Sequence, residues 1–306
     1  MAHVVLSDGR MQEDPSLATE SRVGRWTRRF KMTALKAHRL LEWAARPAEF
    51  GAAPVHASGR FPHLLYGARI PIERHDAHPV FEAGKRHNVR LAAPAFDGLE
   101  LAPDRPFSFW RALGRVTAQR GYRHGMELQG GCIVPSIGGG ICLLSRALFQ
   151  LAVYSGFDIL ERHGHSLVAV EPPPGALWGL DATVLWPYVD LRFAPRRGRV
   201  ALKVQVRDGA LHVSARSTLP LEGAVEVNPI DERVHDRVRT NRIVRRVGGA
   251  FRDVVAVNRS RLLSDPKRSC LTCGETGCHS RVTVSPVGET ATPPAREQAP
   301  ARESFS

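Results

Sequence analysis

The stretch Gly138-Gly139-Gly140-Ile141-Cys142-Leu143-Leu144-Ser145 is followed by an apolar run over 147–154, and together they predict a buried helix beginning near Cys142. Glycines before a helix allow a tight turn, and the first turn of a helix leaves unpaired N–H groups. The positive end of the helix dipole favours a thiolate, so Cys142 is a candidate nucleophile. The three glycines are candidates to supply the N–H groups of an oxyanion hole.

Two histidines and an aspartate follow this helix. His163 and His165 stand at the start of a predicted strand over 167–170, where residues two apart share a face. Asp181 precedes a second predicted strand over 182–185. A helical cysteine with a histidine and an aspartate from neighbouring strands suits the nucleophile, base and orienter of a cysteine hydrolase or acyltransferase. Two alternatives stay open: the histidines and the aspartate bind a metal such as zinc, or the cysteine is a small buried hydrophobe.

Four segments, in this order along the chain, resemble the VanW family. They are Phe107–Trp110, Gly138–Cys142, Glu161–His165 and Asp181–Thr183. The resemblance implies a link to the cell envelope, to peptidoglycan precursors and to glycopeptide (vancomycin) resistance, but the family name alone gives no reaction. The family pattern usually has a glutamine after the cysteine, and this chain has Leu143 there.

Composition limits the partners that suit this chain. It has 306 residues, 43% of them hydrophobic, which suffices for one large domain or two modest ones. The net charge of +13 suits anionic partners: nucleic acid, an acidic membrane surface, or an anionic small molecule such as a phosphorylated or carboxylated precursor. That the precursor is an envelope precursor is what the family resemblance implies. No nucleic-acid-binding motif accompanies the charge, so no specific nucleic-acid partner is predicted. The first residues lack the features of a signal peptide and no long apolar run is present, so we expect a cytoplasmic protein, with or without membrane association.

A helix is predicted from Ser21 to about Pro47. Its apolar positions recur at helical spacing: Trp26, Phe30, Ala34, Ala37, Leu41 and Ala44. Its other face is basic: Arg25, Arg28, Arg29, Lys36 and Arg39. This pattern predicts either an ordinary helix packed on the domain through its apolar stripe or a basic amphipathic helix lying on an anionic membrane.

The pattern after Asp181 is mainly β. Two alternating runs, over 200–206 and 211–215, flank Asp208-Gly209, which is a strong hairpin signal. The predicted fold class is therefore α+β: an antiparallel sheet with packed helices, a central helix that carries the cysteine, and a C-terminal β-hairpin extension. The aromatic cluster Phe107–Trp110 is expected to anchor the core rather than to stack on a ligand.

The expected organisation has four parts. Residues 1–20 form a mobile N-terminus, 21–220 a VanW-like α+β domain, 221–280 the hairpin extension with a cysteine cluster, and 281–306 a disordered tail. The hairpin joins strands over 238–247 and 251–263, and its arginines either grip phosphates or are solvated: Arg242, Arg245 and Arg246.

The cysteine cluster of the extension supplies ligands that structural zinc takes, or thiolates for an iron–sulfur cluster. The expected ligands are Cys270, Cys273, Cys278 and His279. This cluster is the basis of the alternative function, a non-enzymatic accessory or binding module whose C-terminal segment is stabilised by a bound metal. The remaining cysteine, Cys132, is either a redox partner of Cys142 or a reduced, packed residue.

Overall fold

The computed structural model describes residues 22–47, 59–73, 79–129, 132–168, 177–249 and 251–263. Its architecture is α+β with mostly antiparallel sheets and few helices, in line with the coarse fold class expected from the sequence. The helices are α1 (Arg22–Ala45), α2 (Pro79–Ala92), α3 (Phe109–Leu113) and α4 (Cys142–Tyr154). The expected N-terminal segment 1–20, the cluster from Cys270 to His279 and the tail 281–306 lie outside the described residues.

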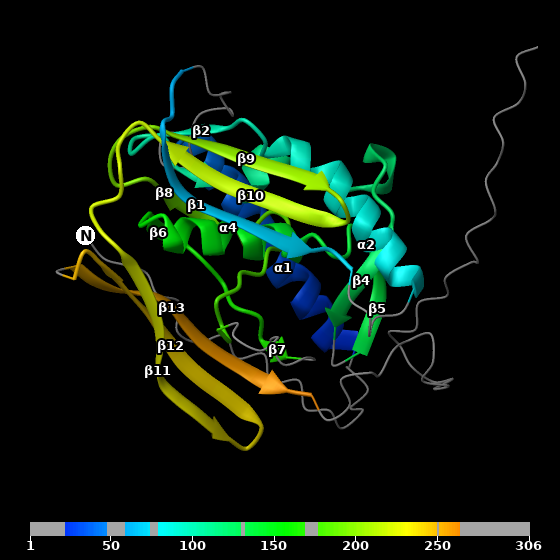
Figure 1. Ribbon diagram of the computed structural model, residues 1–306. Helices are drawn as coiled ribbons and strands as arrows, with labels where there is room; N and C mark the ends of the chain where they lie inside the picture. Colours follow the sequence, from blue (N-terminus) through cyan, green and yellow to red (C-terminus); the bar gives the residue numbers. More distant parts are fainter. Residues whose placement is uncertain are drawn as a thin grey trace, which may run out of the picture.

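The strands form four sheets (Figure 1). The first has the order β1 (His63–Pro71), β10 (Ala210–Ser217), β9 (Val200–Arg207) and β2 (Glu100–Leu101). The second has β11 (Val225–His235), β12 (Val238–Val247), β13 (Phe251–Leu262) and β7 (Leu167–Val168). The third has β3 (Phe107–Ser108), β8 (Arg192–Ala194) and β6 (Asp158–Glu161), and the fourth has β4 (His124–Gln129) and β5 (Cys132–Ile137).

The sheet that contains β9 and β10 covers one side of α4 (Figure 1). The β9–β10 hairpin turns at Asp208 and Gly209, both at positive φ, as the Asp-Gly signal predicted. Alternate residues of β9 (Val200, Leu202 and Val204) are at most 2% exposed, so this strand presents an apolar face to the interior.

Helix α4 lies in the middle of the core. Its apolar residues Leu144, Ala147, Leu148, Phe149, Leu151, Ala152 and Val153 have no exposed surface. A helix that is apolar on nearly all sides is stable only when protein surrounds it. Two side chains fix α4 to the following segment: Ser145 Oγ donates to the carbonyl of Ala182 at 2.6 Å, and Gln150 Nε2 donates to that of Leu180 at 3.1 Å.

The aromatic motif of the sequence is core, as predicted. Phe107, Phe109 and Trp110 are at most 4% exposed. Phe107 stacks on Phe193 of β8 with ring centroids 4.4 Å apart. This contact joins the motif to the sheet that also contains β6, the strand leading into the candidate site.

Two predicted strands need correction. Residues 182–185 form no regular strand, since Thr183 and Leu185 make only isolated bridges, to His163 and Val189. The carbonyls of Asp181 and Ala182 accept from the side chains of Arg162 and Ser145, and the Leu185 carbonyl accepts from the Val189 N–H, so these backbone groups are satisfied without a continuous neighbouring strand. The strand expected over 167–170 is β7, Leu167–Val168, and the rest of that range lies outside the described residues.

The C-terminal sheet packs on the core through a buried arginine. β12 pairs with β13 where the sequence predicted two strands, and β11 adds a third strand that was not predicted. Arg245 of β12 has no exposed surface and binds Asp253 through two nitrogens. Its third nitrogen donates to the carbonyls of Val153 and Phe157 at the C-terminal end of α4. Arg245 is therefore neither solvated nor available to phosphate, and Arg242 pairs with Asp231.

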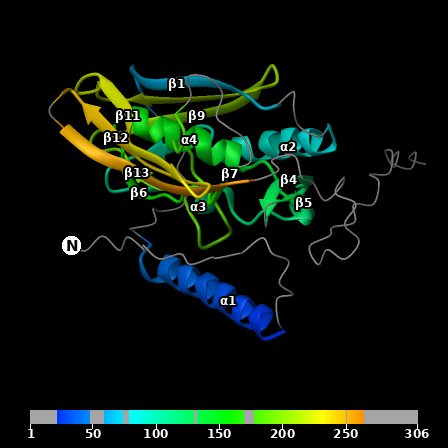
Figure 2. The ribbon, with the colours of Figure 1, turned by 90° about the horizontal axis from the view of Figure 1, so that it is seen from below.

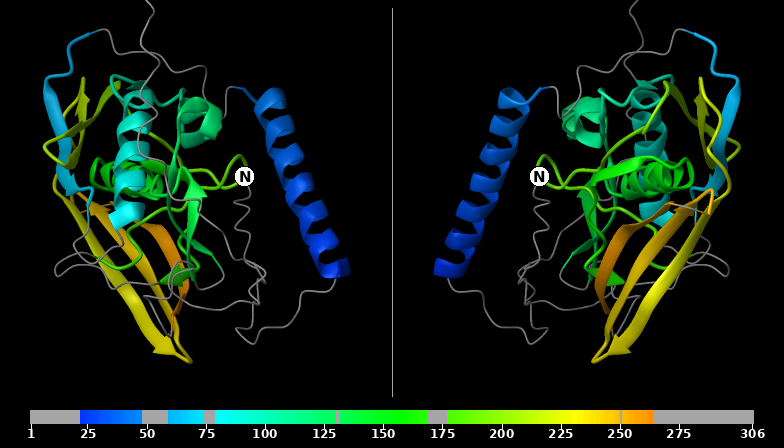
Figure 3. Two further views of the ribbon diagram at one scale, coloured as in Figure 1. Left: turned by 90° about the vertical axis from the view of Figure 1, so that its right-hand side faces the viewer. Right: turned by 90° about the vertical axis from the view of Figure 1, so that its left-hand side faces the viewer.

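Helix α1 lies at the edge of the molecule, where one side faces the body and the other faces outward (Figures 2 and 3). It contacts the body through Met32, Arg39 and Trp43. Phe30 and Leu41, which belong to the stripe expected to pack, are 68% and 69% exposed. The expectation that α1 packs through its apolar stripe is thus wrong, because its inward contacts come from the opposite face. None of the helices in the described ranges is long and apolar enough to cross a bilayer.

Candidate active site

Cys142 is the first residue of α4, directly after the turn formed by the three glycines. The turn lies against β4: a Cβ on Gly139 would meet the backbone carbon of Gly125 at 2.3 Å. Only glycine fits this close approach of two main chains. Cys142 and Cys132 of β5 are both partly exposed, and no disulfide joins them in this structure.

Two N–H groups of the glycine turn already donate to carbonyls of neighbouring segments. Gly138 N–H donates to the carbonyl of Arg123 at 3.0 Å, and Gly139 N–H donates to that of Ser136 at 2.9 Å. The expected oxyanion role therefore does not fit Gly138 and Gly139, because their N–H groups are occupied. Among the described residues, the N–H groups of Gly140 and Cys142 donate to no backbone carbonyl, so these two are the N–H groups left at the start of the helix.

The structure brings Cys142, His165 and Asp181 together. His165 Nδ1 lies 2.6 Å from Asp181 Oδ2, and the imidazole also hydrogen-bonds the Cys142 thiol. With Nδ1 on the carboxylate, Nε2 is the ring nitrogen that faces sulfur. The order thiol, imidazole, carboxylate is that of a nucleophile, its base and the group that orients the base.

His163 points elsewhere. Its Nε2 lies 3.3 Å from Glu161 Oε1, and its side chain is 44% exposed. The prediction that His163 and His165 share a face is wrong because residues 164–166 are not extended strand, so the alternation of side chains does not apply. The two histidines and Asp181 make no metal site: the described residues contain no group of three or more metal-binding side chains arranged around one position.

Donors surround the Cys142 sulfur. Burial alone would raise the pKa of this thiol, but the hydrogen bond and positive charge of His165 lower it, as do the Val184 N–H and the Thr183 hydroxyl. The net effect is a pKa below the ordinary value of 9.0. The bridged segment 183–184 therefore stabilises a thiolate at the start of α4.

His165 has the opposite shift. Burial lowers the pKa of its imidazolium, but the hydrogen bond to Asp181, the hydrogen bond to Cys142 and the charges of both groups raise it to about 10. The pKa of Asp181 would rise on burial, but His165 and the cations Arg162 and Arg146 hold it below its ordinary value. These shifts favour a thiolate and an imidazolium beside an ionised Asp181, and the three groups titrate as a coupled set.

Arg162 is a further residue of this site, and the sequence analysis assigned no role to it. Its side chain is 4% exposed, and its Nη2 donates to Asp181 Oδ1 and to the carbonyl of Gly179, both at 2.8 Å. Its Nε donates to the carbonyl of Asp181 at 2.6 Å. Arg162 also lies over the ring of Phe149 on α4, 5.2 Å from the centroid. It fixes both the carboxylate and the backbone of Asp181 against the helix that carries Cys142.

Strand β13 hydrogen-bonds to the backbone of His165 and Ser166. Ser260 Oγ donates to the carbonyl of His165, and Arg261 N–H donates to that of Ser166 at 2.8 Å. The buried Asn258 donates to Asn241, 2.8 Å away. A Cβ on Gly179 would lie 2.1 Å from Asn258 Nδ2, so this pair also shapes the segment before Asp181. The backbone on both sides of the histidine–aspartate pair is therefore set by the C-terminal sheet.

Arg146 lies one helical turn after Cys142, a spacing that puts two side chains on the same face of a helix. It is partly exposed, and its charge reaches Asp181. Within the described part of the chain, no hydrogen bond or ion pair engages its guanidinium. Leu143, which replaces the family's glutamine, packs against the hydrophobic core and brings no polar group to the site.

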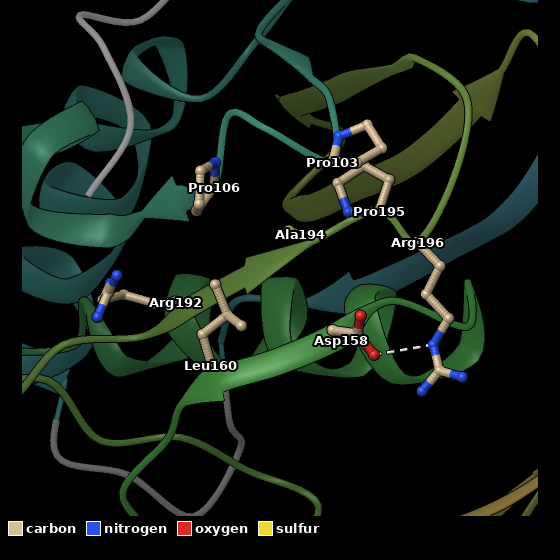
Figure 4. A pocket seen from close by; sticks show the side chains of 8 residues that line it. All are labelled: Pro103, Pro106, Asp158, Leu160, Arg192, Ala194, Pro195 and Arg196. Carbon is tan, nitrogen blue, oxygen red and sulfur yellow. Dashed lines mark ion pairs between the residues drawn. The ribbon is translucent and has the colours of Figure 1, made fainter. Parts of the chain in front are cut away.

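A separate pocket of about 450 Å³ lies between β6 and β8 (Figure 4). Its lining residues are Pro103, Pro106, Asp158, Leu160, Arg192, Ala194, Pro195 and Arg196. Arg196 bridges Asp158 across its edge at 2.8 Å (Figure 4). None of the three residues around the thiol lines this pocket.

Comparison with known proteins covers the segment that carries the site. Residues 84–216 match the family model described as VanW like protein. This segment belongs to the VanW family. All three residues of the Cys142 site lie within it, as does Arg162, whereas α1 and strands β11 to β13 lie outside it.

Two curated relatives match parts of the chain. The Vancomycin B-type resistance protein VanW of Enterococcus faecalis is 29% identical over 134 residues, which are 43% of this chain and 49% of that protein. The uncharacterized protein YoaR of Bacillus subtilis is 35% identical over 109 residues, which are 36% of this chain and 35% of that protein. The chain thus spans half or less of the length of these relatives. No solved structure matches.

Proposed function

We propose that this protein is a cysteine-dependent acyltransferase or hydrolase acting on an anionic, peptide-like precursor of the cell envelope. The observation that supports the proposal is the hydrogen-bonded series Cys142–His165–Asp181 at the start of α4. The lowered thiol pKa and the raised imidazole pKa add to it, since a neighbouring imidazolium is one of the ways in which proteins activate a cysteine.

The first step forms a thioester. The Cys142 thiolate attacks a carbonyl carbon of an amide, and the carbonyl electrons move to oxygen. The N–H groups of Gly140 and Cys142 are the candidate donors to that oxyanion. As the oxyanion collapses, the C–N bond breaks, and the leaving nitrogen takes the proton from the His165 imidazolium.

The second step releases the acyl group. Neutral His165 takes a proton from water or from an incoming amine, whose lone pair attacks the thioester carbonyl. The C–S bond breaks, sulfur leaves as the thiolate, and His165 is again an imidazolium. Water gives hydrolysis and an amine gives transfer. Asp181 orients the imidazole in both steps, and Arg162 positions Asp181.

The substrate class rests on Arg146 and on the relatives. A partly exposed guanidinium one turn from the nucleophile suits a carboxylate on the substrate, because Arg binds carboxylates through paired hydrogen bonds. The Enterococcus faecalis relative is named for vancomycin resistance, which supports an envelope precursor as the source of that carboxylate.

The test is the pH dependence of Cys142 alkylation in the full chain, with His165→Ala as the variant and His163→Ala as its matched control. We expect a fast reaction at neutral pH that slows in His165→Ala, with the thiol pKa returning toward about 8.5, and no change in His163→Ala. A thiol that is inert in the folded protein, or equally reactive in both variants, would contradict the mechanism. The inert thiol is what the non-enzymatic accessory module predicts.

A second test addresses the anionic substrate. Arg146→Gln should raise KM for an acyl donor with a free carboxylate by about tenfold, and should leave its amidated analogue unaffected. Arg69→Gln on β1 is the control, because Arg69 is exposed on another part of the molecule. Equal effects of Arg146→Gln on both donors would remove Arg146 from substrate recognition.

A further inference from the structure

Helix α1 has an apolar face that the described structure leaves open. Phe30 and Leu41 are 68% and 69% exposed, and Ala34, Ala37 and Ala44 on the same side are also exposed. At about 100° per residue these five positions fall within an arc of about 80°. Two large apolar side chains this exposed on one helical stripe exceed what scattered surface residues give.

The contacts that α1 makes with the described part of the body through Met32, Arg39 and Trp43 come from its other face. Arg39 binds Glu161 through two nitrogens, at 2.9 and 2.7 Å, and it also donates to the carbonyl of Tyr188 at 3.1 Å. Trp43 lies edge-on to Trp186 with centroids 5.5 Å apart. Figures 2 and 3 show the helix at one side of the body, set apart from the other helices and the sheets, with its far side outward. Because the inward face is already used, the apolar stripe is available to something else.

Cations flank the stripe. Lys31 and Lys36 are exposed and lie on opposite sides of it, about 100° and 120° from its centre. The acidic residue Glu42 is only partly exposed and is within 3.6 Å of Arg39 and 3.7 Å of His38, so its charge is offset. An apolar stripe bordered by lysines is the pattern of a helix that lies in the interface of an anionic bilayer, with its lysines at the level of the headgroups.

We infer that the outward face of α1 docks the protein on a membrane surface rich in anionic lipid. Phe30 and Leu41 enter the boundary between headgroups and acyl chains, and Lys31 and Lys36 pair with lipid phosphates. Glu161, which holds α1 to the body, directly precedes Arg162 of the candidate active site. The docked helix therefore holds that site close to the bilayer. This inference does not depend on the chemistry of Cys142.

The experiment is sedimentation of the full chain with vesicles of pure phosphatidylglycerol and of pure phosphatidylcholine. We expect binding to phosphatidylglycerol, and a partition coefficient about tenfold lower for phosphatidylcholine. Phe30→Ser/Leu41→Ser should lower binding to phosphatidylglycerol by at least about tenfold. Val234→Ser/Val257→Ser is the matched control, because those valines are 60% and 68% exposed on β11 and β13.

The charge variant is Lys31→Gln/Lys36→Gln, and Lys203→Gln on β9 is its control. The lysine pair should weaken binding to phosphatidylglycerol and reduce its salt dependence, whereas Lys203→Gln should not. Absence of binding would overturn the inference, as would equal binding to both lipids. A dimer in light scattering that Phe30→Ser/Leu41→Ser dissociates, without vesicle binding, would assign the face to a second copy of the chain. All of the variants lie on the surface, and unchanged thermal unfolding would show that each is folded.

Discussion

Asp181 and Asp190 are both largely shielded from solvent, but their pKa values are shifted in opposite directions. Asp181 is 29% exposed in its side chain, and its pKa is held below the ordinary value despite partial burial. Asp190 has no exposed surface, and burial raises its pKa to about 6. The two carboxylates lie nine positions apart in the sequence, so local composition does not separate them.

The difference lies in the charge of the donors. Asp181 meets the imidazolium of His165 and the guanidinium of Arg162. Asp190 meets neutral donors: the Ser108 hydroxyl at 2.5 Å and the N–H groups of Trp110 and Leu191. Glu161 nearby raises the Asp190 pKa further. Asp181 accepts two hydrogen bonds and Asp190 accepts three, yet the pKa is lowered for Asp181 and raised for Asp190. The charged donors of Asp181 outweigh the cost of burial, whereas the neutral donors of Asp190 offset it only in part.

The largest effect is expected from removing the charge of Asp181. Asp181→Asn should lower the pKa of His165 and so reduce the thiolate fraction of Cys142. We expect activity to fall between about a hundredfold and ten-thousandfold. The readout before a substrate is known is the pH profile of Cys142 alkylation. Asp190→Asn, measured beside it, should leave that profile unchanged. If both variants alter the profile equally, the contrast between the two carboxylates is not functional.

The next effect is a loss of folding stability when the side chain of Arg162, which binds Asp181, is removed. Arg162→Met removes one donor from the Asp181 carboxylate and the donors of three carbonyls, and we expect a loss of about 3–5 kcal/mol in the free energy of unfolding. Arg216→Met is the control, since Arg216 donates to two carbonyls at the surface. It should cost within about 0.5 kcal/mol. Urea denaturation of both variants measures the difference. Similar losses would mean that Arg162 stabilises the fold no more than a surface arginine does.

The raised pKa of Asp190 is tested by the pH dependence of the free energy of unfolding. Its folded-state pKa of about 6 exceeds the ordinary 3.8, so its contribution to stability is full below pH 3.8 and is lost as the pH rises through about 6. The shift corresponds to about 3 kcal/mol. Asp190→Asn keeps a carbonyl oxygen for both N–H groups and an amide for Ser108. The difference in unfolding free energy between wild type and variant should therefore change by up to this amount from pH 4 to pH 7. A constant difference would show that Asp190 is ionised throughout.

The smallest effect concerns Cys142 and His165 as a pair. The raised pKa of His165 gives stability that is lost as the pH rises from 6.5 through about 10, whereas the lowered pKa of Cys142 gives stability that is lost as the pH falls below 9.0. The two trends oppose each other where they overlap below pH 9.0, so the stability falls less steeply there than His165 alone would make it fall. Cys142→Ser should therefore steepen the decline in stability above pH 6.5. Urea denaturation across this range measures both slopes, and parallel profiles would indicate an unpaired thiol.

The α+β class, the Asp208-Gly209 hairpin and the buried aromatic motif were predictable because each depends on neighbouring residues. The helix beginning at Cys142 was equally local, since glycines and a long apolar run specify it. The choice between His163 and His165 was not, because it depends on where the strand periodicity stops. Arg162 was missed for a similar reason: nothing in an arginine between a glutamate and a histidine indicates that its side chain will be buried.

The sequence by itself determined the candidate nucleophile, the candidate carboxylate and the two histidines from which the base would come, since motif spacing and residue chemistry specify them. Only the tertiary structure decided that His165 faces the thiol, that Arg162 clamps Asp181, and that β13, beyond the VanW-like segment, supports the histidine. It also decided which face of α1 is outward. The reason is physical: local patterns specify which residues are helical or apolar, whereas the partner of a side chain depends on contacts between residues far apart in sequence.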